Sequence, residues 1–219
     1  MNFKRITIMS GHYGSGKTNI AINLAFDLKK IYNKVAIADI DIVNPYFRTK
    51  DSEQMLNEAG IRLICSEYAN TNVDIPALPQ EIYSITDDKE THCILDVGGD
   101  ERGALALGRI VPSIKEENDY DMFLVVNKYR PLTKDAQSTI EVMREIEQAC
   151  RLKFTGIINN SNLGRETTAE DVLASMNYAE ELSNKANLPL LFTTVEERLF
   201  NELKDKIKAL YPISMQKKL

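Results

Sequence analysis

Residues 11–18 read Gly11-His12-Tyr13-Gly14-Ser15-Gly16-Lys17-Thr18 and fit the pattern G-x-x-x-x-G-K-[ST] at every required position. They follow a β-rich run, Phe3–Met9, and lead into a segment with helical apolar spacing, Lys17–Ile31. In this context glycines let backbone N–H groups point into one concavity, and the helix N-terminus adds partial positive charge. The segment therefore predicts a phosphate-binding loop (P-loop), with Lys17 at the β- and γ-phosphates and Thr18 at Mg²⁺. A glycine turn that merely precedes a helix is the alternative, but motif and context both favour the P-loop.

Short apolar runs alternate with helical patterns along the rest of the chain. The runs are almost continuously apolar, which is typical of strands buried in a parallel sheet. The strands expected after the first are Val35–Ile40, Ile61–Ser66, His92–Asp96, Asp121–Val126, Phe154–Ile158 and Leu188–Phe192. The later helices are expected at Thr133–Gln148, after a Thr167-x-x-Glu170 capping box, and at about Glu196–Leu210. The predicted fold is α/β, with a mainly parallel sheet of about seven strands covered on both faces. We expect a single domain over residues 1–219.

The composition narrows the class of protein. Of the 219 residues, 43% are hydrophobic and 27% are charged, which suffices for one large domain. A formal net charge of −5 gives no clear sign of nucleic-acid binding. No apolar run approaches the ~18 residues that cross a bilayer, and the N-terminus enters a strand-like segment, so we expect a cytoplasmic protein. Cys65, Cys93 and Cys150 lie far apart and predict buried thiols, not a disulfide framework or a local metal motif.

The C-terminal segment carries an apolar stripe. Its members are Leu199, Phe200, Leu203, Ile207 and Leu210. Such a stripe beside lysines is found in helices that lie on a membrane, and equally in surface helices that pack against a core. The sequence gives no clear membrane signal beyond this stripe, and both interpretations stay open.

Two aspartates, Asp39 and Asp41, follow the second expected strand. Ligands of parallel α/β sheets bind at this carboxyl edge, and the period of a strand places both carboxylates on one face. A carboxylate here can orient an attacking water or hold a metal-bound water. The alternative is a pair of aspartates that only caps a turn, because aspartate is common at strand ends.

The run His92–Gly99 ends an apolar strand with Asp96 and two glycines, which is the form of a Walker B segment. Asp96 is expected to hold Mg²⁺ through water or Thr18. An amide of Gly98 or Gly99 is expected to sense the γ-phosphate. Alone this run is weak evidence, but it stands in the right order with the P-loop and the aspartate pair.

These elements resemble the MinD/ParA branch of P-loop nucleotide-binding proteins, the CobQ/CobB/MinD/ParA group of the SIMIBI class. The resemblance spans nearly the whole chain. It rests on GHYGSGKTNIAINLA (11–25), ADIDIVNP (38–45), ILDVGGD (94–100), TGIINNSN (155–162) and LPLLFTTVEE (188–197).

The resemblance implies ATP and Mg²⁺ as cofactors and assigns roles to individual residues. It implies that Lys17 is catalytic, that Asp41 positions the hydrolytic water and that Asp39 supports it. It implies that Thr18, Asp39 and Asp96 bind Mg²⁺. The implied nucleotide-binding residues are Gly11, His12, Tyr13, Gly14, Ser15, Gly16, Lys17, Thr18, Asn19 and Asn160, of which Asn160 stands at the position that reads the adenine edge.

One position departs from the family pattern. The usual loop carries a second lysine directly after the first glycine, which reaches across a nucleotide-bound dimer, and this chain has His12. Histidine is mostly neutral at pH 7 and has a shorter reach, so hydrolysis coupled to dimer formation is in doubt. His12 is either a tolerated loop residue or a donor whose pKa a nearby phosphate raises.

Guanine recognition is not supported, because Asn127-Lys128-Tyr129-Arg130 has arginine where an N-K-x-D motif has aspartate. Arg48 lies in the segment Asn44–Arg48 that follows the aspartate pair, in the first switch region of the family. It is expected either to touch phosphate or a partner, or to stack on Tyr46 or Phe47.

Two functions remain in view. The first is an ATPase, slow without a partner, that acts as a nucleotide-controlled switch or maturation factor, with a protein partner and with homodimer formation in question. The second is an ATP-dependent ligase of the dethiobiotin synthetase and cobyrinate synthase type, which shares the fold and often lacks the extra lysine. The chain shows no second domain typical of a glutamine amidotransferase, which counts against the second function.

Overall fold

The structure is a computed structural model, and it describes residues 3–40, 52–65, 80–99 and 101–215. For residues 80, 101 and 102 the backbone alone is described. Every structural statement below concerns these ranges.

Eight strands in the described ranges form one sheet in which every pairing is parallel. They are β1 (Ile6–Ser10), β2 (Val35–Asp39), β3 (Arg62–Ile64), β4 (His92–Asp96), β5 (Tyr120–Val126), β6 (Gly156–Asn159), β7 (Leu190–Glu196) and β8 (Leu210–Ile213). The order is β3-β2-β4-β1-β5-β6-β7-β8. The chain leaves β1 toward β2 on one side and later continues to β5 on the other. Such a switch point forms a crevice at the carboxyl ends of the strands.

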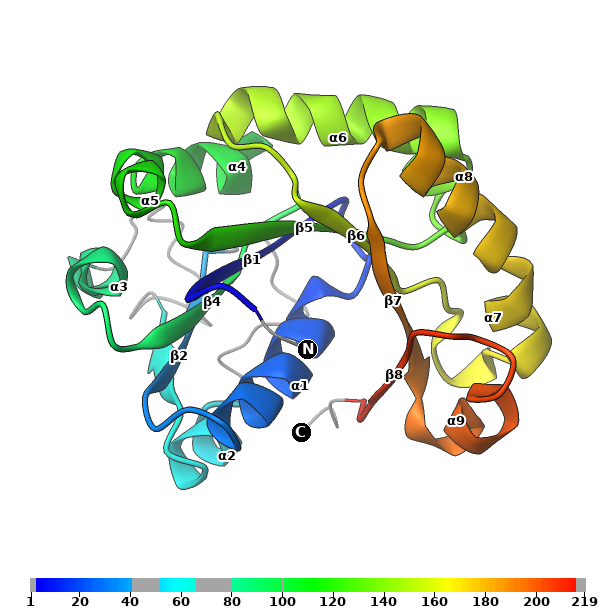
Figure 1. The fold of residues 1–219 in the computed structure, drawn as a ribbon, viewed down its shortest axis with the longest axis horizontal. Helices are drawn as coiled ribbons and strands as arrows, with labels where there is room; N and C mark the ends of the chain where they lie inside the picture. Colours follow the sequence, from blue (N-terminus) through cyan, green and yellow to red (C-terminus); the bar gives the residue numbers. More distant parts are fainter. Residues whose placement is uncertain (1–2, 41–51, 66–79, 100, 216–219) are drawn as a thin grey trace, which may run out of the picture.

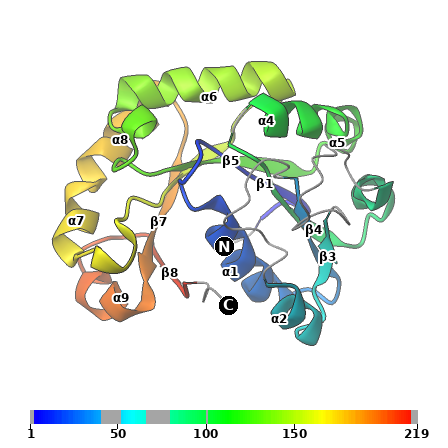
Figure 2. The ribbon, with the colours of Figure 1, turned by 180° about the vertical axis from the view of Figure 1, so that it is seen from behind.

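Helices cover both faces of the sheet, as Figures 1 and 2 show from opposite sides. The α-helices are α1 (Lys17–Lys29), α2 (Glu53–Glu58), α3 (Ser84–Asp87), α4 (Glu101–Gly108), α5 (Val111–Glu117), α6 (Ala136–Cys150), α7 (Ala169–Ala174), α8 (Met176–Ala186) and α9 (Glu197–Leu203). Short 3-10 turns lie at Gln80–Tyr83, Pro131–Thr133 and Gly164–Glu166. Helices α1 and α2 lie on one face, and α4, α6 and α8 lie on the other. The predicted α/β fold with a doubly covered parallel sheet is confirmed.

Two hydrophobic cores follow from the alternation of side chains along the strands. In β1, Ile8 enters the core under α4, α5, α6 and α8, while Met9 enters the core under α1 and α2. Both side chains are 0% exposed. The second core fixes α1 on the sheet through Ile20 and Leu24, so it also fixes the loop that precedes this helix.

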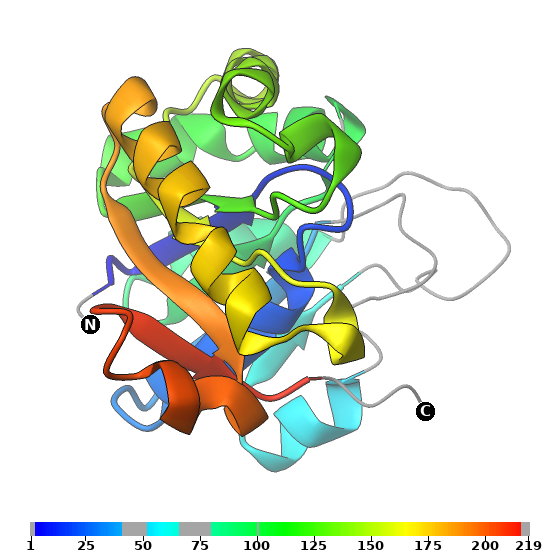
Figure 3. The ribbon, with the colours of Figure 1, turned by 90° about the vertical axis from the view of Figure 1, so that its right-hand side faces the viewer.

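The C-terminal region differs from the prediction. The helix expected to reach Leu210 ends at Leu203, and Leu210–Ile213 forms an eighth strand on the outer edge of β7 (Figure 3). The pairing satisfies backbone groups of β7 that an edge would expose, and Tyr211 packs on Phe192 with ring centroids 5.0 Å apart. The helical spacing of the apolar residues concealed this strand, and Pro212 is a residue that sheets accept only at their edges.

The capping box lies one residue later than predicted. Thr168 caps α7 and pairs reciprocally with Asp171, so the predicted Thr167-x-x-Glu170 box is wrong. The hydroxyl of Thr167 instead donates to the carbonyl oxygen of Gly164 at 2.6 Å. Because this hydroxyl closes the preceding turn, the helix starts one residue later.

The apolar stripe near the C-terminus packs inside the molecule. Leu199, Leu203 and Ile207 are buried together with Val172 and Val195, in a small core between α7, α9 and the end of β7. The core-packing interpretation of the stripe is therefore confirmed. Within the described ranges, no helix has the length and apolar character needed to cross a bilayer.

Cys65, Cys93 and Cys150 form no disulfide with one another. Cys93 and Cys150 are buried as predicted, whereas Cys65 is only half-buried. Burial raises the pKa of the Cys93 thiol to about 12, so this side chain is not a thiolate nucleophile at neutral pH.

Arg5 holds the amino edge of the sheet together. It is 5% exposed, forms an ion pair with Glu117 of α5, and donates to the carbonyl oxygens of Ile85, Asp88 and Thr91 at 2.9 to 3.1 Å. A buried charge with this many partners is costly to remove, because its partners lose their hydrogen bonds.

We predict that Arg5→Ala lowers the free energy of unfolding by about 3 kcal/mol, measured by urea denaturation. Lys4→Ala is the matched control, because Lys4 pairs with Asp119 at 3.6 Å with side chains 55% and 45% exposed. We expect Lys4→Ala to cost less than about 1 kcal/mol. Equal effects of the two variants would contradict the role given to Arg5.

Candidate phosphate and nucleotide site

The P-loop adopts a conformation that depends on its glycines. Gly11, Gly14 and Gly16 have φ angles of 144°, 75° and 88°, a region that side chains disfavour. A Cβ on Gly11 would lie 2.3 Å from the carbonyl oxygen of Val125 in β5. The loop therefore lies directly against the sheet, with no room for a side chain at this contact.

The inner surface of the loop fits phosphate. Helix α1 begins at Lys17 without a side-chain cap, so its first N–H groups face the loop. The ammonium of Lys17 lies 3.0 Å from the carbonyl oxygen of Gly11 and points across the loop. Ser15 Oγ is buried and has no hydrogen-bond partner among the described residues. These donors converge where the sequence predicts the phosphates.

The residues predicted to bind Mg²⁺ are brought together at the ends of β2 and β4. Thr18 Oγ1 donates a hydrogen bond of 2.6 Å to Asp96 Oδ2. Asp39 is the register partner of Asp96 on the neighbouring strand, so the two side chains share the α1 face of the sheet. Both aspartates are buried, 8% and 1% exposed.

This oxygen donor set fits Mg²⁺. The described ranges contain no cluster of three or more histidine, cysteine or acidic side chains placed to hold a metal. Mg²⁺ does not require one, since it usually takes one or two carboxylates, several waters and phosphate oxygens. Thr18, Asp39 and Asp96 are consistent with Mg²⁺ bound together with a nucleotide.

The glycines after Asp96 pack against the P-loop and against α4. A Cβ on Gly99 would lie 2.4 Å from the backbone nitrogen of Tyr13 and 2.7 Å from the carbonyl oxygen of Gly11. A Cβ on Gly103 would lie 2.6 Å from Cα of Gly98. The segment after β4 is therefore in direct backbone contact with the loop on one side and with α4 on the other.

Asn160 lies at the end of β6 and links two parts of the site. Its amide nitrogen donates to the carbonyl oxygen of Ser15 at 2.5 Å, and its amide oxygen accepts from the hydroxyl of Thr194 in β7. It is 3% exposed. In this arrangement the side chain predicted to read adenine supports the P-loop.

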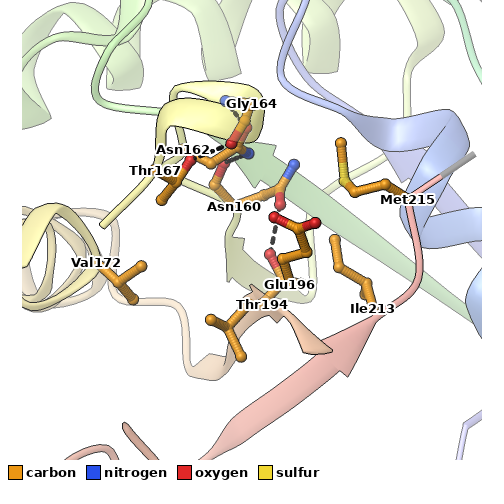
Figure 4. A pocket seen from close by; sticks show the side chains of 10 residues that line it. Asn160, Asn162, Gly164, Thr167, Val172, Thr194, Glu196, Ile213 and Met215 are labelled. Atoms are coloured by element: carbon orange, nitrogen blue, oxygen red, sulfur yellow. Dashed lines mark hydrogen bonds between the residues drawn. The ribbon is translucent and has the colours of Figure 1, made fainter. Parts of the chain in front are cut away.

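A recess beside Asn160 opens at the carboxyl ends of β6, β7 and β8, and we call it the base recess (Figure 4). It is open to solvent, and its cavity volume is about 20 Å³. It is lined by Asn160, Asn162, Gly164, Thr167, Val172, Thr194, Val195, Glu196, Ile213 and Met215. Mixed apolar walls with a few polar groups are typical of small-molecule sites.

His12 is held in one tautomer. Its Nδ1 lies 2.9 Å from the carbonyl oxygen of Tyr13. A carbonyl only accepts, so Nδ1 carries the proton and Nε2 of the neutral ring keeps its lone pair. Burial lowers the pKa of His12, the Tyr13 carbonyl opposes this, and the charges of Lys17 and Arg130 lower it further. The lowered pKa keeps His12 neutral at pH 7, so it does not replace the charge of a lysine.

The segment that departs from N-K-x-D joins three loops. Arg130 Nε donates to the carbonyl oxygen of Gly14 at 2.9 Å, which places a guanidinium on the outside of the P-loop. Asn127 is buried, and its side chain donates to the carbonyl oxygen of Asn162 and accepts from the N–H of Tyr129. These residues connect the loop after β5 with the P-loop and with the loop after β6.

Several predicted residues lie outside the described ranges. Asp41 and the segment Asn44–Arg48 are among them, so their predicted roles remain predictions. Asn19 is described, and its amide lies 3.3 Å from the sulfur of Met215.

Three residues at the site carry contacts that the sequence did not reveal. Thr194 binds Asn160, Arg130 binds Gly14, and Met215 meets Asn19. These partners are 34, 116 and 196 residues apart along the chain. No local pattern reports contacts over such separations.

We predict that Gly99→Ala lowers the free energy of unfolding by about 1–3 kcal/mol, because the new Cβ forces the loop away from β4. Gly108→Ala is the matched control in the same region, where the nearest atom to a Cβ lies 3.9 Å away. We expect Gly108→Ala to leave stability unchanged or to raise it by up to about 1 kcal/mol. Urea denaturation of both variants checks the contact, and similar curves would argue against it.

Both histidines of the chain, His12 and His92, have a lowered pKa, with burial as the main cause. We predict that both titrate below the unfolded value of about 6.5 when followed by NMR of the ring carbons. As the pH falls below about 6.5, these histidines bind protons more readily in the unfolded chain than in the folded chain, so the free energy of unfolding falls with decreasing pH. His12→Asn assigns the two signals, and a His12 pKa above 6.5 in the protein alone would contradict the lowered value.

The chain matches the model of the CobQ/CobB/MinD/ParA nucleotide binding domain over residues 6–187. A comparison with curated proteins gives no match. Among solved structures, FtsY from Mycoplasma mycoides is 16% identical, with a TM-score of 0.58 over 90% of this chain and 61% of that chain. Cell division protein FtsY from Thermotoga maritima is 19% identical, with a TM-score of 0.57 over 90% of this chain and 64% of that chain.

The signal recognition particle 54 kDa protein from Aeropyrum pernix, in complex with GDP, is 16% identical, with a TM-score of 0.52 over 88% of this chain and 41% of that chain. At such identities the likeness shows the fold alone, and this chain spans less than two thirds of each of these proteins. The family match includes the P-loop, the end of β4 and the end of β6. The chain belongs to the CobQ/CobB/MinD/ParA nucleotide-binding domain family.

Proposed function

We propose that this protein binds ATP with Mg²⁺, hydrolyses it slowly, and uses its nucleotide state to control its affinity for a protein partner. The observation that carries the proposal is the hydrogen bond of 2.6 Å between Thr18 and Asp96. It joins the first turn of α1 to the strand that continues into Gly98 and Gly99. Binding or loss of Mg²⁺ at Asp96 would therefore act on Gly98 and Gly99, which follow it within three residues and pack on the P-loop and α4.

We propose individual roles for the residues of the site. Lys17 and the backbone of Gly11–Asn19 bind and orient the phosphates, and Thr18, Asp39 and Asp96 hold Mg²⁺. Asp41, supported by Asp39, positions the attacking water. When bound, Mg²⁺ would neutralise charge on the β- and γ-phosphate oxygens during transfer.

The contacts of Gly99 support a switch role. Its backbone touches Tyr13 and Gly11 at the end of the P-loop where a γ-phosphate is expected, and the neighbouring Gly98 touches Gly103 of α4. Contact changes at the γ-phosphate position would thus reach α4 through backbone atoms. In nucleotide switches, the nucleotide state changes the order or the position of such segments, and partner proteins bind one of the two arrangements.

ATP is the proposed nucleotide because Arg130 replaces the aspartate of the guanine motif and Asn160 stands at the adenine position of the family. One similar structure, the protein from Aeropyrum pernix, contains GDP, so guanine nucleotides belong in the test. Because His12 is neutral, it cannot supply the charge of the loop lysine that reaches into a second copy. This favours control of a partner by the monomer and disfavours hydrolysis that depends on a dimer.

The test compares binding and turnover of ATP and GTP, with and without Mg²⁺, while light scattering follows the molar mass. We predict slow Mg²⁺-dependent ATP hydrolysis that falls at least about 100-fold in Lys17→Ala and in Asp41→Ala. Lys30→Ala, at the residue directly after α1, is the matched control, since the side chain of Lys30 is 74% exposed and pairs only with Asp27 in the described structure.

Other outcomes discriminate between functions. Turnover that appears only with a small carboxylate, at constant molar mass, would favour the ligase alternative. An ATP-dependent doubling of the mass would show homodimer formation despite His12. A wild-type protein that binds no nucleotide would overturn the proposal.

A further inference from the structure

We infer that the C-terminal segment Ile213–Met215 forms the outer wall of the base recess, and that Met215 packs against the base of the bound nucleotide. The inference rests on the proposed function and deepens it. It assigns the contact with the base to residues 213–215, for which no sequence motif predicts such a contact.

The segment is fixed in place by Asn23, on the second turn of α1. The amide nitrogen of Asn23 donates to the carbonyl oxygen of Ser214 at 2.9 Å, and its amide oxygen accepts from the N–H of Ser214 at 2.8 Å. The hydroxyl of Ser214 donates to Glu197 at 2.7 Å. Three hydrogen bonds on one residue hold the backbone directly before Met215.

Met215 is placed by this anchor at the edge of the recess. Its sulfur lies 3.3 Å from the amide nitrogen of Asn19, and 43% of the residue is exposed. Figure 4 shows Met215 and Ile213 on one side of Asn160, with Thr167 and Val172 on the other. An aromatic base placed beside Asn160 on this side would therefore border the thioether of Met215 and the side chain of Ile213.

The chemistry of the recess favours packing over hydrogen bonding. The side chain of Asn160 is already bonded to Ser15 and Thr194, and that of Asn162 is bonded to the backbone of Asn160 and Gly164. Polar groups that are already paired offer little to a ligand edge. The sulfur of methionine, by contrast, is polarisable and makes favourable contacts with aromatic rings.

Helix α1 connects this wall to the phosphates. The helix starts at Lys17 and Thr18, and Asn23 lies on it five residues after Thr18. The phosphate loop leads directly into α1, and the proposed wall of the base recess is hydrogen-bonded to the same helix through Asn23. Asn23 acts as a positioning residue, because it holds Met215 and does not itself line the recess.

The experiment compares two probes by calorimetry in the presence of Mg²⁺, ATP and inorganic tripolyphosphate, which has phosphates but no base. We expect Met215→Ala and Asn23→Ala to weaken ATP binding about fivefold and to leave tripolyphosphate binding unchanged. Met55→Ala is the matched control, a methionine of similar exposure (46%) on α2 that does not line the recess.

Two results would overturn the inference. One is ATP binding by Met215→Ala that equals the wild type, and the other is an equal loss for both probes, which would place the effect on the phosphate loop. If Lys17→Ala abolishes binding while Met215→Ala does not change it, the inference alone fails. If the wild type binds neither probe, the proposed function fails as well.

A second measurement needs no variant in the recess. With methyl-labelled methionine, NMR observes the seven methionines of the chain, and Met215→Ala serves only to assign one signal. We expect ATP to shift the Met215 methyl signal upfield, since it would lie over the face of a ring, and tripolyphosphate to leave it in place. A signal that responds equally to both probes contradicts the contact with the base.

Discussion

The architecture of the site depends on the close approach of the P-loop backbone to the ends of two strands. Gly11 contacts β5 and Gly99 contacts the loop from the end of β4, at separations that exclude any side chain. Buried backbone groups in such contacts need partners, and the loop obtains them from Asn160 and Arg130. The phosphate cradle is therefore a product of the sheet as well as of its own eight residues.

Asp96 and Asn160 each make more than one of the contacts that hold the site together. Asp96 ends the central strand β4, binds Thr18, and precedes the glycines that touch the loop. Asn160 supports the loop through Ser15 and borders the base recess. The same side chains therefore hold the loop and border the proposed ligand positions. Under the proposed function, an exchange of protein contacts for ligand contacts at these side chains would act as the switch.

Much of the fold and part of the candidate site could be predicted from local patterns. The seven apolar runs and the motif at Gly11–Thr18 gave the parallel sheet and the position of the loop, because buried parallel strands and glycine turns leave strong local signals. The eighth strand was missed, since Leu210 continues the helical spacing of α9 and only the open edge of β7 makes Leu210–Ile213 a strand. The start of α7 was misplaced by one residue, because two adjacent threonines can both cap and only the turn at Gly164 decides between them.

The sequence by itself determined the features that are local in the chain. These are the P-loop, the acids Asp39 and Asp96 at the ends of two strands, and the order of strands and helices along the chain. Those features need only neighbouring residues, and the family match agrees with them. Tertiary structure alone decided that Asn160 turns onto Ser15, that Arg130 lies on Gly14, and that Met215 reaches the base recess. The contacts of Asn160 with Ser15, of Arg130 with Gly14 and of Met215 with Asn19 join residues 145, 116 and 196 positions apart. Their geometry follows from the packing of the sheet, which no short pattern encodes.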